Sequence, residues 1–167
     1  RAGEISAAGH REAMRLACPG MYEYQVQAGM EFVFRTLGSA RNGYGSIVAA
    51  GRNATILHYV VNNACMKDGD LLLIDAGAEY AYYTADITRT FPVSGRFSSA
   101  QRDVYSVVLD AQQAAIKASV IGVTKDEIHD LAVKTLSQGL LDLGVLSGSI
   151  EEVIEKETFK RFYMHGT

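Results

Sequence analysis

The sequence predicts an α+β domain built from an antiparallel sheet with covering helices, and three observations support this class. Apolar residues recur at helical spacing in residues 5–37 and again in residues 98–159, near the two ends of the chain. Between them, residues 71–93 alternate or run apolar in the manner of strands. The 167 residues are 48% apolar and 21% charged, a composition that supports a globular core.

Two helices are predicted at the start of the chain. The first covers Ile5 to Cys18 and is stopped by the Pro19-Gly20 pair. The second runs from about Tyr22 to Leu37, where Gly38 follows as a helix-ending residue.

The strand region comes next and is less regular at its start. Residues 43–51 and 55–61 contain short β-branched or aromatic runs, which indicate short strands or extended loops. The run Leu71 to Ile74 is continuously apolar, has strand length, and ends in Asp75. A further strand covers about Tyr82 to Val93.

Capping patterns open the helices that follow. The Ser-x-x-Gln pattern at Ser98 opens a long helix that reaches Val120, and the Thr-x-x-Glu pattern at Thr124 opens another that ends near Gly144. A shorter helix is predicted for residues 149–159.

Composition narrows the class of protein. The net charge is -3 without a basic run, so nucleic acid is not an expected partner. No apolar stretch approaches the roughly 20 residues needed to span a bilayer, and residues 1–20 lack a signal-peptide pattern. We therefore expect a cytoplasmic protein with Cys18 and Cys65 reduced. Because the chain starts at Arg1 and stops at Thr167 within a motif, we expect a piece of a longer protein.

Asp75 and Asp86 form the first candidate site. Alternation along residues 84–91 places Asp86 on one strand face with the neighbouring threonines. A hairpin with Tyr80-Ala81 as its two-residue turn would set Asp86 directly opposite Asp75. Two opposed carboxylates repel each other, and a divalent cation would turn this repulsion into binding.

A structural interpretation of the two acids stays open from spacing alone. Asp75 could cap a turn, and Asp86 could pair with Arg89. The Tyr80-Ala81 pair also lacks the Asn-Gly or Gly chemistry that tight hairpins prefer. Thr88 lies two residues after Asp86 on the same face, where it could support a carboxylate or simply favour a strand.

The other motifs are weaker. The segment Gly43 to Ser46 does not match a phosphate loop, because no Gly-Lys-Ser/Thr follows it. His10 and His129 lie on predicted helices without carboxylates at ligand spacing, so we interpret both as structural residues.

Several segments together resemble one family of metallopeptidases. They are Ile74–Gly77, Thr84–Val93, Arg1–Ile5, Cys18–Met21, Ile56–Tyr59 and Phe162–Gly166. In this order they resemble family M24, the pita-bread (creatinase/aminopeptidase) fold, and most of all its bacterial Xaa-Pro aminopeptidases. The resemblance spans essentially the whole chain.

The resemblance implies a fold and a set of metal ligands. Residues 1–167 would form the N-terminal portion, about the first half, of the catalytic domain, with another domain before it and the C-terminal half of the site beyond it. Asp75 would bind one metal ion and Asp86 would bridge two. The three further ligands of the family, a histidine and two glutamates, would come from the half that this chain does not contain.

The same resemblance assigns two histidines to the catalytic pocket. His165 is similar to the first histidine of a His-Gly-x-Ser-His motif, which lines the pocket, whereas the metal-binding histidine of that motif would follow Thr167. His58 is similar to another pocket histidine, near the residue that follows the scissile bond.

The implied activity is release of the N-terminal residue from peptides with proline in second position, by attack of a metal-bridging hydroxide. The implied cofactors are two divalent ions, Mn²⁺ in the first place, with Zn²⁺ or Co²⁺ as alternatives. The full-length protein is expected to form a homo-oligomer. This fragment alone is expected to be inactive and to bind metal weakly.

Two other functions are kept as alternatives. One is an Xaa-Pro dipeptidase (prolidase), which belongs to the same chemical class. The other is a pita-bread domain without metal that acts as a binding module, against which the intact Asp75 and Asp86 argue.

Overall fold

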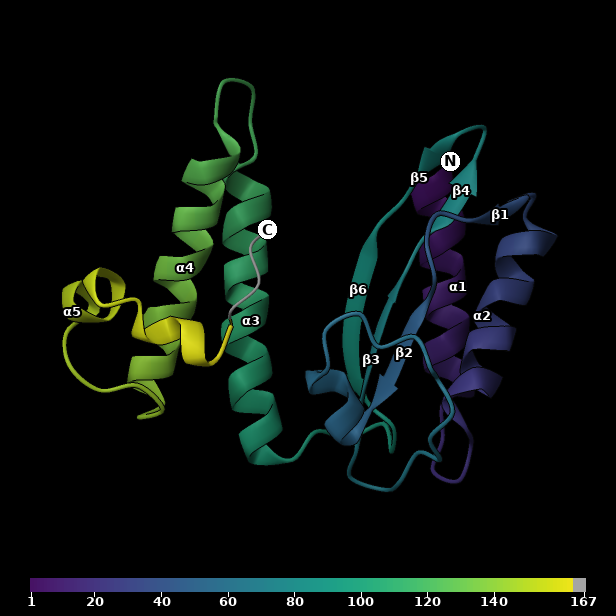
Figure 1. The fold of residues 1–167 in the computed structure, drawn as a ribbon, viewed down its shortest axis with the longest axis horizontal. Helices are drawn as coiled ribbons and strands as arrows, with labels where there is room; N and C mark the ends of the chain where they lie inside the picture. Colours follow the sequence, from purple (N-terminus) through teal and green to yellow (C-terminus); the bar gives the residue numbers. More distant parts are fainter. Residues whose placement is uncertain (164–167) are drawn as a thin grey trace. The chain divides into compact units, whose positions relative to one another are not determined.

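The computed structural model describes residues 1–163, which fall into two compact units, residues 1–97 and a helical unit that begins at Ser98. Figure 1 shows the elements of both units. In the first unit they are α1 (Ala2–Leu16), α2 (Glu23–Thr36), β1 (Arg41–Asn42), β2 (Ile47–Ala50), the 3₁₀ helix η1 (Gly51–Thr55), β3 (Leu71–Ala76), β4 (Ala78–Tyr80), β5 (Tyr83–Thr84) and β6 (Ile87–Pro92).

The two N-terminal helices are confirmed at nearly the predicted bounds. The predicted α+β class with an antiparallel sheet is also confirmed, because β2, β3 and β6 pair antiparallel in the order β2-β3-β6. Of the two short runs before β3, residues 47–50 form a strand. Residues 56–61 are irregular and are held by contacts with α2 that are described below.

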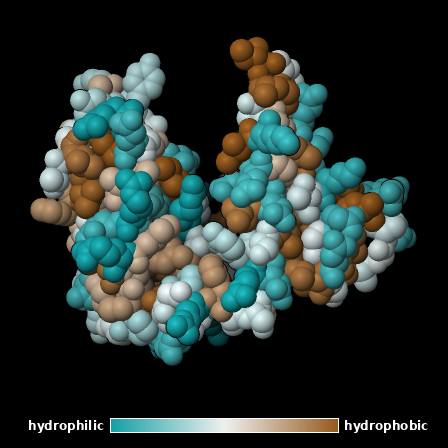
Figure 2. All heavy atoms as spheres, turned by 180° about the vertical axis from the view of Figure 1, so that it is seen from behind, coloured by the Kyte–Doolittle hydropathy of each residue, from teal (hydrophilic) through white to brown (hydrophobic). Residues whose placement is uncertain are grey.

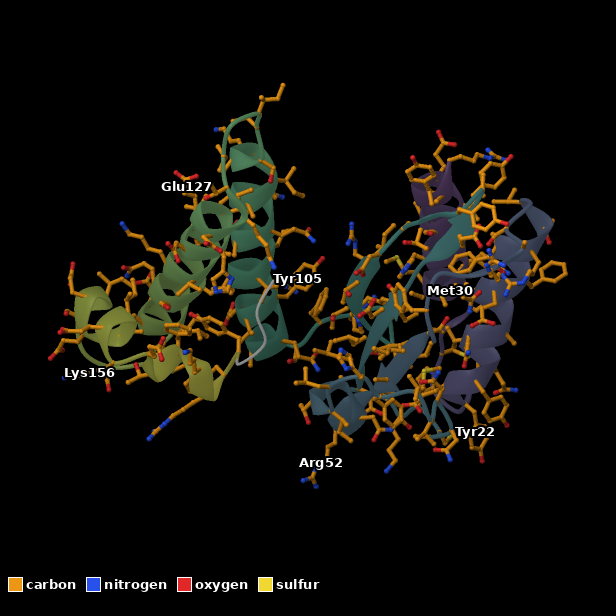
Figure 3. The ribbon with its side chains drawn as sticks, turned by 45° about the horizontal axis from the view of Figure 1, so that its top comes forward. Tyr22, Met30, Arg52, Tyr105, Glu127 and Lys156 are labelled. Atoms are coloured by element: carbon orange, nitrogen blue, oxygen red, sulfur yellow. The ribbon has the colours of Figure 1, made fainter. Side chains whose placement is uncertain are left out.

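One face of the β2-β3-β6 sheet builds the core of this unit. Val48, Leu72 and Ile74 lie on this face and are fully buried together with Met30 and Phe34 of α2. Figure 1 shows α1 and α2 on the same side of the strands, and Figure 3 shows Met30 within that layer. The opposite face carries Asp75 together with Ile47 and Ala49.

The hairpin turn lies one residue later than predicted. Tyr80 pairs with Tyr83, so the two-residue turn is Ala81-Tyr82, and both residues have positive φ angles of 52° and 67°. Left-handed φ at both positions is the geometry of a type I′ hairpin turn, although neither residue is the usual Gly, Asn or Asp. Asp75 consequently pairs with Thr88, and the expectation that it lies directly opposite Asp86 is wrong.

The shifted register nevertheless keeps both acids on one face. Because side chains alternate with a period of two, a shift of two positions in pairing leaves every side chain on its original side. Continuing the register of β4-β5 and β3-β6 across the gap between them places Asp86 opposite Gly77.

The helical unit contains α3 (Ser99–Ala118), α4 (Lys125–Asp142), α5 (Ile150–Glu155) and the 3₁₀ helix η2 (Thr158–Arg161). The capping boxes predicted at Ser98 and Thr124 are both formed. The loop between α3 and α4 presents apolar side chains, including the fully exposed Ile121, and forms the brown tip in Figure 2. No helix within residues 1–163 combines the length and apolar content needed to cross a bilayer.

Candidate metal centre

Asp75 and Asp86 lie where the two strands of the hairpin separate. Asp75 is half-buried near the end of β3, and Asp86 is exposed in the short irregular stretch between β5 and β6. Opposite this stretch the chain passes from β3 to β4 through Gly77. The two carboxylates therefore flank a local break in the strand pairing.

Helix α1 supplies hydrogen bonds to the backbone at this break. The Nε2 of His10 donates to the carbonyl oxygen of Ala76 at 3.0 Å, and the hydroxyl of Ser6 accepts from the amide of Ala78 at 2.8 Å. Ser6 and His10 are four residues apart, so they share one face of the helix on either side of Gly77. His10 is therefore a buried structural residue, in line with its interpretation from sequence.

Tyr44 joins the two carboxylates. Its hydroxyl lies 2.5 Å from Oδ1 of Asp75 and 3.1 Å from Oδ1 of Asp86. The segment that carries Tyr44 is held to the same break, because the amide of Gly43 donates to the carbonyl oxygen of Gly77 at 2.8 Å. Side chains from three separate segments thus converge at one point.

The electrostatics of this cluster favour a cation. A phenol has one proton, so the Tyr44 hydroxyl can donate to only one carboxylate at a time. Burial raises the pKa of Tyr44, and the hydrogen bond and negative charge of Asp75 raise it further. The hydroxyl therefore stays protonated at neutral pH and adds no charge of its own.

Asp75 and Asp86 have no cationic partner among the ion pairs formed within residues 1–163. Two convergent carboxylates are hard oxygen ligands of the kind that divalent ions prefer. Within the described residues, however, no three His, Cys, Asp or Glu side chains come together as a metal site. The cluster fits two ligands of a divalent site and not a complete one.

Asp86 does not form an ion pair with Arg89, which was the structural alternative for this residue. Arg89 donates to the backbone carbonyl of Thr88 at 2.7 Å and lies on the other strand face. Thr88 pairs with Asp75 across the β3-β6 ladder and is exposed. The side chain of Thr88 thus lies next to that of Asp75 on the same strand face.

His58 lies in the irregular segment after η1, exposed and with a φ of 53°. The next residue, Tyr59, packs with Ile47 and Ala49. Ile47 is the direct ladder partner of Asp75, so this apolar cluster sits on the sheet face that carries Asp75. The His58 segment therefore covers part of the same face.

Two further histidines, His165 and His129, were singled out from the sequence. His165, assigned to the pocket by resemblance, lies outside the described residues. His129 lies on α4 and is half-buried.

Sequence reasoning missed Tyr44. From the sequence its segment is expected to form a short strand or extended loop and does not match a phosphate loop, so no site residue is predicted there. Tyr44 lies between β1 and β2, three residues before Ile47, which is the ladder partner of Asp75. The contacts themselves join residues 31 and 42 positions apart, which local patterns do not reveal.

Comparison with known proteins places the chain in a family. The model for metallopeptidase family M24 matches residues 1–167. The Xaa-Pro aminopeptidase of Haemophilus influenzae is 45% identical over 166 residues, which cover 99% of this chain and 39% of that protein. The Xaa-Pro aminopeptidase of Escherichia coli is 42% identical over 99% of this chain and 38% of its own length.

Solved structures agree with these sequence matches. Aminopeptidase PepP of Pseudomonas aeruginosa superimposes with a TM-score of 0.97 at 49% identity, over 99% of this chain and 37% of that chain. A zinc-substituted aminopeptidase P of Escherichia coli in complex with product also gives a TM-score of 0.97, at 42% identity over 99% of this chain and 38% of its own. The chain thus spans less than two fifths of the length of these relatives. Its fold and its sequence both show that it belongs to metallopeptidase family M24.

Proposed function

We propose that this chain supplies two of the ligands of a two-metal aminopeptidase site. In the full-length enzyme, Asp75 would hold one ion and Asp86 would be shared by two, and the remaining ligands would come from the part of the protein beyond residue 167. The observation that carries the proposal is the convergence of both Oδ1 atoms on the Tyr44 hydroxyl, at 2.5 and 3.1 Å.

The substrate follows from the relatives. The relatives from Haemophilus influenzae and Escherichia coli are named Xaa-Pro aminopeptidase. We therefore infer that the full-length protein releases the N-terminal residue from peptides with proline in second position. We further infer a cytoplasmic enzyme that assembles as a homo-oligomer. Neither nucleic acid nor membrane is part of the proposed function.

When bound, the divalent ions would lower the pKa of a bound water towards about 7 and polarise the scissile carbonyl. Mn²⁺ is the proposed ion, with Zn²⁺ and Co²⁺ as alternatives. The chain's own residues prepare the site for this chemistry. Asp75 and Asp86 provide hard oxygen ligands, and the Tyr44 hydroxyl orients them by hydrogen bonding.

We place His58 and His165 in the pocket around the ions. The apolar cluster beside His58 covers the face that carries Asp75, so this segment is suited to exclude water from the reacting groups. His165 would line the same pocket.

The experiment that tests the function uses the full-length enzyme, because two carboxylates do not complete the site. With Mn²⁺ present, an Xaa-Pro-Xaa tripeptide should release its first residue, and chelation should stop the release. Absence of any metal-dependent release would refute the proposal. Turnover of the Xaa-Pro dipeptide but not of the tripeptide would identify a prolidase instead.

A further inference from the structure

Helix α2 faces the loops beside β2 with a stripe of polar side chains. Glu23, Gln27 and Glu31 stand four residues apart, so they lie along one side of the helix. Glu23 is fully buried, and the other two are half-buried. A helix that packs only through apolar contacts would not need these groups, so their partners are informative.

Glu23 collects four hydrogen bonds from one stretch of chain. Its Oε1 accepts from the amide of Ala50 at 2.7 Å and from Nδ2 of Asn53 at 3.0 Å. Its Oε2 accepts from the hydroxyl of Tyr59 at 2.8 Å and from the amide of Ala64 at 2.9 Å. One carboxylate thus holds both ends and the middle of residues 50–64.

This arrangement ties the position of His58 to Glu23. None of the ion pairs within residues 1–163 involves Glu23, so its buried charge is stabilised by the four donors. If residues 50–64 moved away from α2, the carboxylate would lose these donors inside the core, which is costly. His58 stands between Asn53 and Tyr59, and its backbone lies in the less favourable left-handed region. Residues on both sides of His58 are therefore held to Glu23.

Glu31 does the same for the segment that carries Tyr44. Its Oε1 accepts from Nδ2 of Asn42 and from the hydroxyl of Ser46, both at 2.8 Å. These two residues stand on either side of Tyr44. The start and the end of this short segment are thus fixed to α2 through one oxygen atom.

Gln27 connects Glu31 with Asn62, which belongs to the stretch that Glu23 holds. Its Nε2 donates to Oε1 of Glu31 at 2.9 Å, and its Oε1 accepts from Nδ2 of Asn62 at 2.9 Å. Asn62, in turn, donates to the carbonyl oxygen of Ser46 and accepts from the amide of Val48. The two held segments therefore belong to one hydrogen-bond network along the edge of the sheet.

We propose that Glu23 and Glu31 are positioning residues of the metal site, Glu23 acting through Asn53 and Tyr59 on His58, and Glu31 acting through Asn42 and Ser46 on Tyr44. The inference rests on the proposed function, since it takes His58 and Tyr44 as parts of that site. It adds that the site depends on a helix whose side chains touch neither metal nor substrate.

Amide hydrogen exchange tests the two arms separately and does not require activity. In Glu23→Gln, an NH₂ group replaces one acceptor oxygen. This group faces N–H or O–H donors that formerly bonded to Glu23, so these hydrogen bonds are lost. Exchange in residues 52–64 should rise about tenfold or more, because a lost hydrogen bond to a charged group is worth at least that factor. Residues 42–46 should change little. Glu31→Gln should give the reverse pattern.

The matched control is Glu12→Gln, which makes the same chemical change on α1 at a surface acid bonded to Arg15. It should leave both segments unchanged. Exchange at residues 52–64 that is equal in Glu23→Gln and Glu12→Gln would overturn the proposal. If Glu23→Gln does not fold, Tyr59→Phe removes the hydroxyl that donates to Glu23 and accepts from Nδ2 of Asn53, and it should still accelerate exchange at residues 55–60. Unchanged exchange there would equally overturn the proposal.

Kinetics on the full-length enzyme separates positioning from general stability. Glu23→Gln alone should lower kcat/KM about tenfold. In a His58→Ala background it should add less than about a twofold loss, because both substitutions remove the same contribution, that of a correctly placed His58. An equal tenfold loss in both backgrounds would show that Glu23 does not act through His58. If the enzyme shows no metal-dependent release at all, the proposed function fails, while the exchange pattern still decides whether α2 holds the two segments.

Discussion

The carbonyl oxygen of Ala85 lies against the α-carbon of Gly77, so closely that a β-carbon on Gly77 would come within 1.6 Å of it. This contact occurs where the hairpin strands separate and where Asp86 leaves the ladder. The close approach of the two strands here is thus possible only for glycine, and it brings Asp86 towards Asp75 and Tyr44.

Gly77→Ala should therefore damage both the fold and the site. The β-carbon would push the strands apart, which costs about 1–3 kcal/mol or more in a well-packed position. Urea unfolding of the 167-residue chain measures the loss. Gly3→Ala is the control, because a β-carbon there meets no atom within 4 Å. Equal unfolding midpoints for the two variants would contradict the account of the break.

Tyr44→Phe should impair the site more than the fold. The variant loses the hydroxyl that lies between the two carboxylates and keeps the ring. In the full-length enzyme we expect kcat/KM to fall by roughly 10–100-fold, the range seen when a group that orients metal ligands is removed. Tyr24→Phe, at a half-exposed tyrosine of α2, should have no such effect. If both variants behave alike, Tyr44 does not orient the ligands.

Local signals in the sequence located the regular elements well. The helix starts at Ser98 and Thr124 follow from side chain to backbone contacts only three residues apart, which a sequence pattern contains in full. The apolar run Leu71 to Ile74 likewise marks a strand wherever it packs. The position of Asp75 at its end is a direct consequence.

Contacts without a standard sequence signal explain where the structure differs from the prediction. The turn is at Ala81-Tyr82, whose left-handed backbone has no Gly or Asn signal; the amide of Tyr82 instead donates to Glu79 at 2.8 Å. Residues 56–61 are irregular and are held instead by the Tyr59 hydroxyl, which bonds to Glu23, 36 positions away. The predicted and observed registers differ by two positions, so Asp75 and Asp86 share one strand face in both.

His10 should make the fold sensitive to mildly acidic pH. Burial lowers the pKa of His10 below its ordinary value of 6.5, and the positive charge of Arg89 lowers it further, although the Ala76 carbonyl and Asp75 oppose this. The unfolded chain therefore takes up the proton at a higher pH than the folded chain. Its contribution to stability is present above about pH 6.5 and is lost as the pH falls below that value.

Urea unfolding between about pH 7.5 and 5.5 checks this prediction, since ordinary carboxylates titrate lower. In His10→Gln the side chain keeps an N–H donor but cannot gain charge, so the unfolding free energy should depend less on pH than in the unmodified chain. A pH profile that is identical in His10→Gln and the unmodified chain would rule out His10 as its source.

The 167-residue chain alone should bind metal weakly. Two carboxylates provide only part of a coordination shell. Divalent ions of this kind take about six or more oxygen ligands in total, or fewer where histidine is among them. Calorimetric titration with Mn²⁺ should show no micromolar site. A tight site in this chain would mean that residues other than Asp75 and Asp86 supply further ligands.

The most direct test of the central claim is the metal content of the full-length enzyme after dialysis against Mn²⁺, compared with that of Asp86→Asn. If Asp86 bridges two ions, the unmodified enzyme should retain two per chain and Asp86→Asn at most one, with peptide release lost. Asp68→Asn, at an exposed aspartate in the turn before β3, should retain both ions and full activity. Retention of two ions and undiminished Xaa-Pro cleavage in Asp86→Asn would contradict the account.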